Sequence, residues 1–254
     1  MLIITADDFG KTRLATDSIL KCYSGQAITS ASAMVFMEDS ARAASLAASS
    51  ALEIGLHLNF TLPFSAANIP PNLHEHQNRI ISYLAGGTLP QVFYNPFIKN
   101  SFKVVFQSQS EEFLRLYGRP PDFYNGHHHM HLCANVIAGK LLPAGSRTRR
   151  TFTFYGGEKG LINRFYRAVL DRRIDRRYIS TDVFFNITPI SDTERLHRIV
   201  ARAAKEDVEI EVHPENAEES DFLLCKEFRD LLNSADRGSF MRLSPRMSLR
   251  ECPR

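Results

Sequence analysis

Four clusters of acidic and histidine side chains follow short apolar runs, and together their residue types could bind a metal ion. They are Asp7-Asp8, His57, the cluster 127–131, and Glu211 with His213. Because the carboxyl ends of parallel strands lie on one side of an α/β fold, side chains from these positions would meet there. Carboxylate and imidazole ligands suit zinc, manganese, iron or cobalt, and tolerate magnesium that keeps several waters. The sequence therefore predicts a metal centre assembled from four strand ends.

The segment 126–131, with the sequence GHHHMH, is the strongest of these signals. Its alternative interpretation is a surface tract that binds metal loosely. In an extended chain His127 and His129 would share a face, whereas His127 and His131 would share one only in a helix, so the spacing leaves the ligand open. Taken singly, an Asp pair is often a helix cap, and His57 could be a core histidine with a hydrogen-bonding partner. Because all four clusters fall at the ends of predicted strands, one shared site is favoured.

Short apolar runs alternate with helical patterns along the whole chain. The predicted strands cover residues 2–5, 28–36, 52–60, 123–124, 152–155, 183–187 and 208–212. The first predicted helix begins after residue 10. The others cover residues 39–49, 99–117, 134–142, 161–171, 192–205 and 221–232. Residues 61–97 contain five prolines and show no regular pattern. The alternation predicts an α/β fold with a mostly parallel sheet, open or closed into a barrel. We expect a single domain over 1–254, with its core at about 2–235 and a polar tail at 236–254.

Composition excludes several classes of protein. The chain has 254 residues, of which 44% are hydrophobic and 23% charged, and its formal net charge is +3. These values argue against a disordered chain, and the charge is too small to indicate nucleic-acid binding. No apolar run approaches the length of a transmembrane segment, and the start lacks the features of a signal peptide, so we expect a cytoplasmic protein. The basic stretch 147–177 is interpreted as a solvated helix face or as a rim that attracts an anionic substrate.

Several segments resemble the YdjC-like carbohydrate deacetylase family, which includes chitooligosaccharide and hopanoid-associated deacetylases. The matching segments are TADDFG at 5–10, ITSA at 28–31, GLHLN at 55–59, GRPP at 118–121, GHHHMH at 126–131 and EVHP at 211–214. The chain departs from the family pattern at Asn125, where many relatives have an aspartate. The resemblance implies an irregular (β/α) barrel, a hydrolase that uses a divalent metal ion (magnesium or zinc), and a homodimer.

The resemblance also implies roles for individual residues. Asp8, His57 and His127 would bind the metal ion. Asp7 would be the general base and His213 the general acid. A further set would contact the substrate or orient the other groups, with His131 as a reserve ligand: Asn59, Arg119, Asn125, His129, His131 and Glu211.

The predicted reaction removes an N-acetyl group from an oligosaccharide or a lipid-linked sugar by means of a metal-activated water. Successive side chains at an extended strand end point to opposite sides, so one of Asp7 and Asp8 can bind the ion while the other handles protons. The alternatives are a metal-dependent hydrolase of another amide or a phosphoester, and a carbohydrate- or metal-binding relative without turnover. A pure binder would not need Asp7 beside the ligand, which favours an enzyme.

Overall fold

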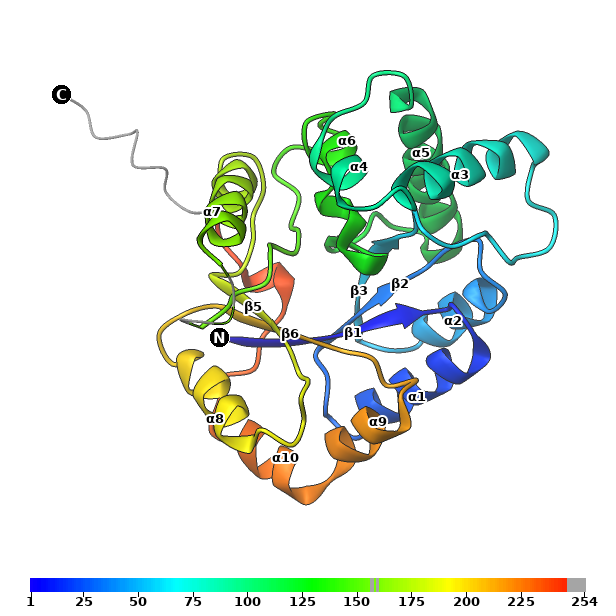
Figure 1. Cartoon of the computed structure of the whole chain (residues 1–254). Helices are drawn as coiled ribbons and strands as arrows, with labels where there is room; N and C mark the ends of the chain where they lie inside the picture. The colour runs from blue at the N-terminus through cyan, green and yellow to red at the C-terminus, as the bar shows by residue number, and fades with distance from the viewer. Residues whose placement is uncertain (156–157, 159, 246–254) are drawn as a thin grey trace.

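Six parallel strands form the centre of the fold, which the computed structural model describes over residues 1–155, 158 and 160–245. The strands lie side by side in the order β4-β3-β2-β1-β6-β5 (Figure 1). Their bounds are Leu2–Phe9 (β1), Ser30–Ala33 (β2), Glu53–Leu58 (β3), Tyr124–Gly126 (β4), Val183–Asn186 (β5) and Val208–Val212 (β6). Helices cover the sheet, and its strands are accordingly almost completely buried. Because all strands run in one direction, their carboxyl ends share one side of the sheet.

An irregular segment joins the two edges of this sheet. The backbone carbonyl of Arg147 accepts the N–H of Tyr124 in β4 at 2.9 Å. The N–H of Thr153 donates to the carbonyl of Phe184 in β5 at 2.8 Å. Edge strands β4 and β5 are thus bridged without a regular strand between them, which confirms the expected irregular barrel.

The strand predicted at 152–155 is wrong. Residues 151–155 form no regular strand, although Thr153 pairs with β5 through its backbone. The N–H of Phe184 donates to the Thr153 hydroxyl at 3.2 Å. A side chain therefore takes a hydrogen bond that a continuous ladder would give to the backbone.

The helices confirm most of the predicted pattern. Their bounds are Arg13–Ser24 (α1), Ser40–Ala47 (α2), Pro71–Leu84 (α3), Thr88–Val92 (α4), Lys99–Tyr117 (α5), Ala134–Ile137 (α6), Leu161–Asp175 (α7), Thr193–Arg202 (α8), Ala217–Leu224 (α9) and Lys226–Leu232 (α10), with short 3₁₀ turns at His127–Leu132 and Phe240–Arg242. The helix expected at 134–142 ends early. The helix expected at 221–232 is two helices that meet at Cys225, whose sulfur accepts the N–H of Phe228 as the cap of α10. Within the described residues, no helix has the length and apolarity needed to cross a bilayer.

The expectation of irregular structure at 61–97 is wrong for much of that segment, because α3 and α4 lie within it. Pro71 occupies the first turn of α3, where a proline lacks no hydrogen bond that the helix would otherwise make. The buried positions of α3, which include Leu73, Ile80 and Leu84, recur at helical spacing. The sequence of α3 therefore has a helical pattern of apolar residues although prolines precede it.

The packed core extends beyond residue 235. Phe240 is fully buried and stacks on Phe123, with the ring centroids 4.0 Å apart. The carboxylate of Glu53 accepts the backbone N–H groups of Phe240 and Met241 at 2.9 and 2.8 Å. The chain up to Leu243 therefore packs against the amino-terminal ends of the strands, whereas residues 246–254 of the expected tail lie outside the described residues.

Candidate metal centre

The aspartate pair at the end of β1 reaches the site through an unusual backbone conformation. Asp8 has a φ of 71°, in the left-handed region, and the pairing of β1 with β2 shifts register between Ala6 and Phe9. Such a break in the extended conformation cancels the alternation expected for successive strand residues. Both Asp7 and Asp8 consequently line the same cleft.

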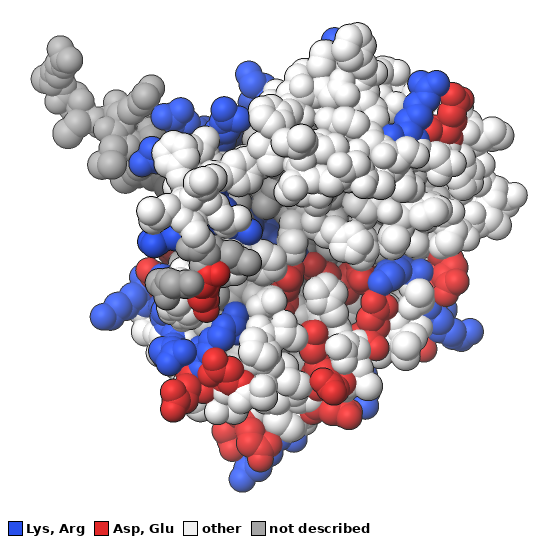
Figure 2. Space-filling view, in the orientation of Figure 1, with Lys and Arg blue, Asp and Glu red and all other residues white. Residues whose placement is uncertain are grey.

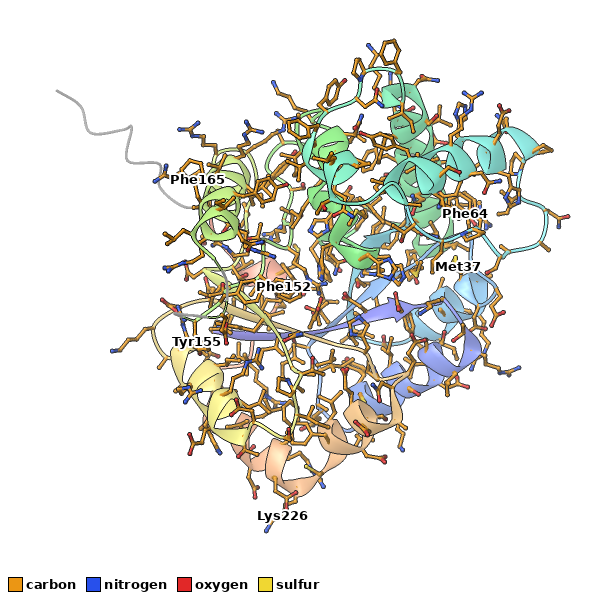
Figure 3. The ribbon with its side chains drawn as sticks, viewed as in Figure 1. Met37, Phe64, Phe152, Tyr155, Phe165 and Lys226 are labelled. Atoms are coloured by element: carbon orange, nitrogen blue, oxygen red, sulfur yellow. The ribbon has the colours of Figure 1, made fainter. Side chains whose placement is uncertain are left out.

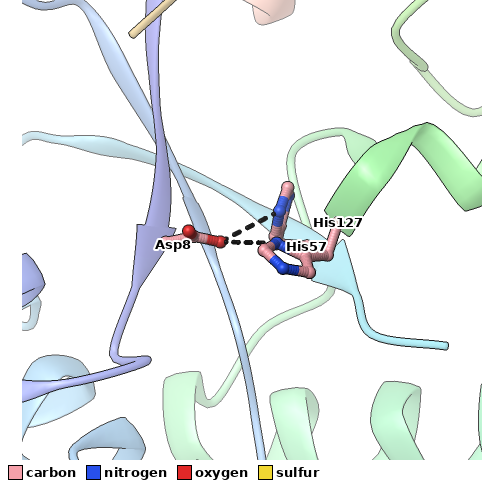
Figure 4. A group of neighbouring side chains, drawn as sticks. All are labelled: Asp8, His57 and His127. Atoms are coloured by element: carbon pink, nitrogen blue, oxygen red, sulfur yellow. Dashed lines mark hydrogen bonds and ion pairs between the residues drawn. The ribbon is translucent and has the colours of Figure 1, made fainter. Parts of the chain in front are cut away.

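Asp8, His57 and His127 form a compact, buried group (Figure 4). Oδ1 of Asp8 lies 3.0 Å from Nδ1 of His127 and 3.3 Å from Nε2 of His57. One ligand atom from each residue lies within 4.8 Å of the others. Lys11 at the rim donates to the second oxygen of Asp8 at 2.9 Å. These three side chains, which come from three strand ends, could hold one metal ion.

Nε2 of His57 is placed as a metal ligand would be. This atom is buried and makes no hydrogen bond to any described residue, although it faces Asp8. A buried imidazole nitrogen without a partner is costly, and a cation beside Asp8 would satisfy it. Two imidazole nitrogens and one carboxylate oxygen also leave coordination positions open for water and substrate. The donor set therefore fits a divalent ion.

The other ring nitrogen of His57 is held by a polar network. Its Nδ1 donates to Oδ1 of Asn125 at 2.8 Å and lies 3.1 Å from the hydroxyl of Ser32. Asn125 and Ser32 in turn donate to Oδ1 of Asp7 at 3.1 and 2.8 Å. With the proton on Nδ1, the lone pair of Nε2 is free to face Asp8. Asn125 thus orients His57 and links it to Asp7, as an orienting residue would.

A fully buried arginine, Arg149, contacts the carboxylate of Asp7. Arg149 donates to both oxygens of Asp7 at 2.6 and 2.9 Å, and to Glu209 and Glu211 at 2.7 and 3.0 Å. Its guanidinium also lies 4.7 Å from the ring centroid of Phe184. Burial would raise the pKa of Asp7, but the charge and hydrogen bonds of Arg149 hold it well below its ordinary value. Asp7 is therefore ionised at neutral pH.

Arg149 corrects the interpretation of the stretch 147–177 as a surface feature. Arg149 and its neighbour Arg150 both point into the fold, and Arg150 bonds the carbonyl of Thr181 at 2.7 Å. Neither Arg149 nor Ser32 was predicted as a site residue. The signal for Arg149 was indirect, because Asp7, Glu209 and Glu211 all follow or lie in apolar strands and need a buried counter-charge.

The histidine cluster forms a tight turn, in which His128 and His129 have φ values of 51° and 59°. This conformation is neither strand nor helix, so neither predicted face pattern applies. His131 is fully buried and its Nε2 lies 3.2 Å from the carbonyl of Arg149. Burial and the charge of Arg149 lower its pKa to about 3. The structure thus places His131 outside the group formed with Asp8.

His129 and Glu211 line the site beside Asp7. Nε2 of His129 lies 3.6 Å from Oε1 of Glu211, and its ring packs edge-on against Phe152. Burial and the charge of Asp7 raise the pKa of Glu211 well above its ordinary value, although Arg149 opposes the shift. His213 comes directly after β6 and lines the same cleft, of about 700 Å³. Its backbone N–H donates to Glu219 at 2.7 Å. Both proposed proton-transfer groups, Asp7 and His213, therefore face one cleft with the metal-binding group.

Two expected site residues lie elsewhere. Arg119 is exposed and pairs with Asp122 at 2.5 Å. Asp122 also accepts the N–H of Ile54 near the amino end of β3, so Arg119 lies at the opposite end of the sheet from His57. Asn59 is buried, and its side-chain oxygen accepts the N–H groups of residues 61 and 62. The structure brings neither side chain to the lining of the cleft.

Comparisons with known proteins agree with this architecture. A chitooligosaccharide deacetylase of Proteus mirabilis (strain HI4320) is 31% identical over 139 residues, and one of Yersinia pestis (strain Pestoides F) is 29% identical over 143 residues. Each alignment covers 54% of this chain and 52% of the relative, about half of its length. The crystal structure of a "putative cellobiose-phosphate cleavage protein" from Enterococcus faecalis V583 superposes with a TM-score of 0.66 at 20% identity. That superposition covers 94% of this chain and 97% of the other, so the two share a fold.

The match to a family is more extensive than these pairwise alignments. The sequence model described as YdjC-like protein matches residues 1–237. The matched range includes every residue of the cleft described above. The chain therefore belongs to the YdjC-like protein family.

Proposed function

We propose that this protein is a metal-dependent carbohydrate deacetylase, which hydrolyses an N-acetyl group on an amino-sugar-containing substrate. The observation that carries the proposal is the buried group of Asp8, His57 and His127 beside an ionised Asp7. The names of the Proteus and Yersinia relatives support the choice of substrate class. An N-acetylated oligosaccharide or a lipid-linked sugar remains the proposed substrate, and a cytoplasmic location and a homodimer stay predictions.

The proposed cofactor is a divalent ion held by Asp8, His57 and His127. Bound there, it would polarise the acetyl oxygen and lower the pKa of a neighbouring water. The two imidazole nitrogens favour zinc or another first-row transition metal over magnesium, which prefers oxygen ligands. Asn125 serves this site by keeping the proton of His57 on Nδ1.

Proton transfer is assigned to two side chains of the cleft. Asp7 accepts a proton from the attacking water, and Arg149 holds its carboxylate in place through two hydrogen bonds. When the C–N bond breaks, His213 gives a proton to the departing amine. Water thus adds to the acetyl carbon, and the products are acetate and a free amino sugar.

The test is an assay of acetate release across N-acetylated mono- and oligosaccharides. The protein is first treated with a chelator, then supplied with zinc, manganese or magnesium. Acetate release that disappears with the chelator and returns with a metal supports the proposal. Release of phosphate from sugar phosphates under the same conditions, without acetate, would favour a phosphoester hydrolase. Metal binding without any turnover would favour a binding protein.

A further inference from the structure

A second cavity opens beside the metal-binding cleft, between α4 and α7. Its volume is about 300 Å³, and its lining includes Gln91 of α4 and Tyr166 of α7. His128 and His129 line both this cavity and the cleft of the metal centre. The cavity and the cleft are therefore adjacent, and α4 and α7 flank the cavity.

Both borders of this cavity carry exposed apolar side chains. Eight of the twelve large apolar side chains that are exposed within the described residues lie on α4, on residues 93–97 or on the first turns of α7. They include Leu89, Phe93 and Phe97, which are 69%, 64% and 95% exposed, and Ile162 and Phe165, which are 87% and 71% exposed. Apolar residues gathered in this way mark a surface that contacts another protein or a membrane. We call α4, residues 93–97 and α7 the α4–α7 surface.

The segments that carry these side chains are anchored to the fold. The side chain of Asn135 donates to the carbonyl of Asn95 at 2.8 Å and accepts its N–H at 3.1 Å. On the other border, Asp171 of α7 accepts the backbone N–H and the hydroxyl of Thr151 at 3.1 and 3.0 Å. The apolar side chains are thus held outward by an ordered backbone, so their exposure belongs to the folded protein.

Basic side chains continue the outer face of α7. Arg172, Arg173 and Arg176 are exposed in its last turns and beyond, after the exposed Ile162 and Phe165 of its first turns. Figure 2 shows Lys and Arg side chains around α7, whereas acidic and basic side chains are mixed on the lower half of the same view. Figure 3 places Phe165 on this helix, above Phe152. An apolar tip next to arginines is the pattern that binds the interface of an anionic bilayer.

We propose that the α4–α7 surface docks this protein on an anionic lipid bilayer. The exposed phenylalanine, leucine and isoleucine side chains would enter the boundary between headgroups and acyl chains, and the arginines would contact the headgroups. A second copy of the chain fits less well, because its own α4–α7 surface would offer these arginines no exposed acidic side chain. Docking holds the opening of the cavity toward the headgroups. This proposal does not rest on the deacetylase activity.

The test is co-sedimentation of the full chain with vesicles, in the absence of substrate. Vesicles of phosphatidylcholine alone are compared with vesicles that also contain phosphatidylglycerol. We expect binding to the anionic vesicles, weakened by salt, and about a fivefold loss of partitioning for each arginine that is removed from the lipid surface. The apolar variant is Ile162→Ser with Phe165→Ser, and the charge variant is Arg172→Glu with Arg176→Glu.

Matched controls lie on other faces of the molecule. Leu14→Ser removes an apolar side chain that is 64% exposed on α1, and Arg198→Glu reverses an exposed charge on α8. Both controls should bind vesicles as the unmodified protein does, and all variants should keep its thermal midpoint because the positions are exposed. Equal binding to neutral and anionic vesicles, or equal losses in the controls, would overturn the proposal. So would a dimer in sedimentation velocity that the Ile162–Phe165 variant dissociates while vesicle binding is absent.

Discussion

Arg149 donates two hydrogen bonds to the carboxylate of Asp7, at 2.6 and 2.9 Å, from a position with no exposure to solvent. The same guanidinium contacts Glu209 and Glu211 on β6. Because β6 pairs with β1 in the sheet, one cation serves three carboxylates that reach it from adjacent strands. Arg149 therefore joins the stability of the barrel to the position of the proposed general base.

Removal of the Arg149 charge should destabilise the fold. Arg149→Met would leave the ionised Asp7 buried without a counter-charge and would remove the hydrogen-bond donor of Glu209 and Glu211, and we expect a loss of about 3–5 kcal/mol in the free energy of unfolding. Arg149→Lys should recover part of that loss, since it keeps the charge but not the paired hydrogen bonds to Asp7. Chemical denaturation measures both. Arg150→Met is the matched control, because it removes a buried arginine that bonds Thr181 and Asp171 but none of these three carboxylates, and it should cost less stability than Arg149→Met. An Arg149→Met protein as stable as the unmodified one would contradict this account.

Asp7→Asn should separate turnover from metal binding. The change keeps the shape of the side chain but removes the charge that would accept a proton, so we expect kcat to fall by about 10²–10⁴-fold. Metal content, measured by atomic emission, should stay near that of the unmodified protein, since Asp7 is not among the three grouped ligands. Asp17→Asn, on the exposed side of α1, is the control. Full activity of Asp7→Asn would remove Asp7 from the mechanism.

Local patterns in the sequence predict the strand ends and a metal site beside them, whereas the choice of Asp8, His57 and His127 as ligands depends on the family resemblance. Apolar runs that stop at a polar side chain indicate the pair Asp7-Asp8 and His57, because buried parallel strands leave little other room for such residues. What could not be read locally depends on long-range pairing. Arg149 occupies the interior only because its segment crosses from β4 to β5 over the carboxylates of β1 and β6. A cluster of arginines in a sequence is ordinarily solvated, and nothing nearby marked one of them as buried.

The structure differs from the sequence-based expectation at two further places, residues 61–97 and the histidine cluster, and each difference has a local cause. The prolines of 61–97 suggested a loop, yet Pro71 is compatible with the first turn of α3. Strand and helix spacing both assume a regular backbone at 127–131, whereas the left-handed conformations of His128 and His129 turn the chain so that His127 and His131 point to different partners.

Phe240 should matter to stability although it lies outside the expected core. Phe240→Ala would remove a fully buried ring that stacks on Phe123, and we expect a loss of about 3–5 kcal/mol. Met241→Ala is the matched control, since Met241 is its neighbour and is 54% exposed, and it should cost less than about 1 kcal/mol. Thermal and chemical denaturation give the comparison. Equal effects of the two changes would show that residues after 235 are not part of the core.

His57 and Asn125 should affect metal affinity in a graded way. His57→Ala removes a grouped ligand and should abolish both metal binding and activity. Asn125→Ala keeps the ligand but releases its Nδ1 from the hydrogen bond that fixes the tautomer, so we expect a 10–100-fold loss of affinity. Competition with a chromogenic chelator measures both affinities. Metal retained at full occupancy by His57→Ala would show that the ligand set is different.

Glu211 should make the stability of the fold depend on pH. Its pKa is raised well above 4.5 in the folded protein, mainly by burial and also by the charge of Asp7. At a pH between the ordinary pKa of the unfolded chain and this raised pKa, the folded state holds a proton that the unfolded state has lost. The free energy of unfolding that Glu211 contributes therefore falls as pH rises. Glu211→Gln carries no such charge, and its thermal midpoint should therefore gain on that of the unmodified protein as pH increases from about 4.5 to neutral. Melting curves of both proteins over this range, under chelator so that metal binding does not contribute, provide the measurement. A difference that stays constant, or one that moves in the opposite direction with pH, would show that Glu211 is ionised beside Arg149 at every pH in the range.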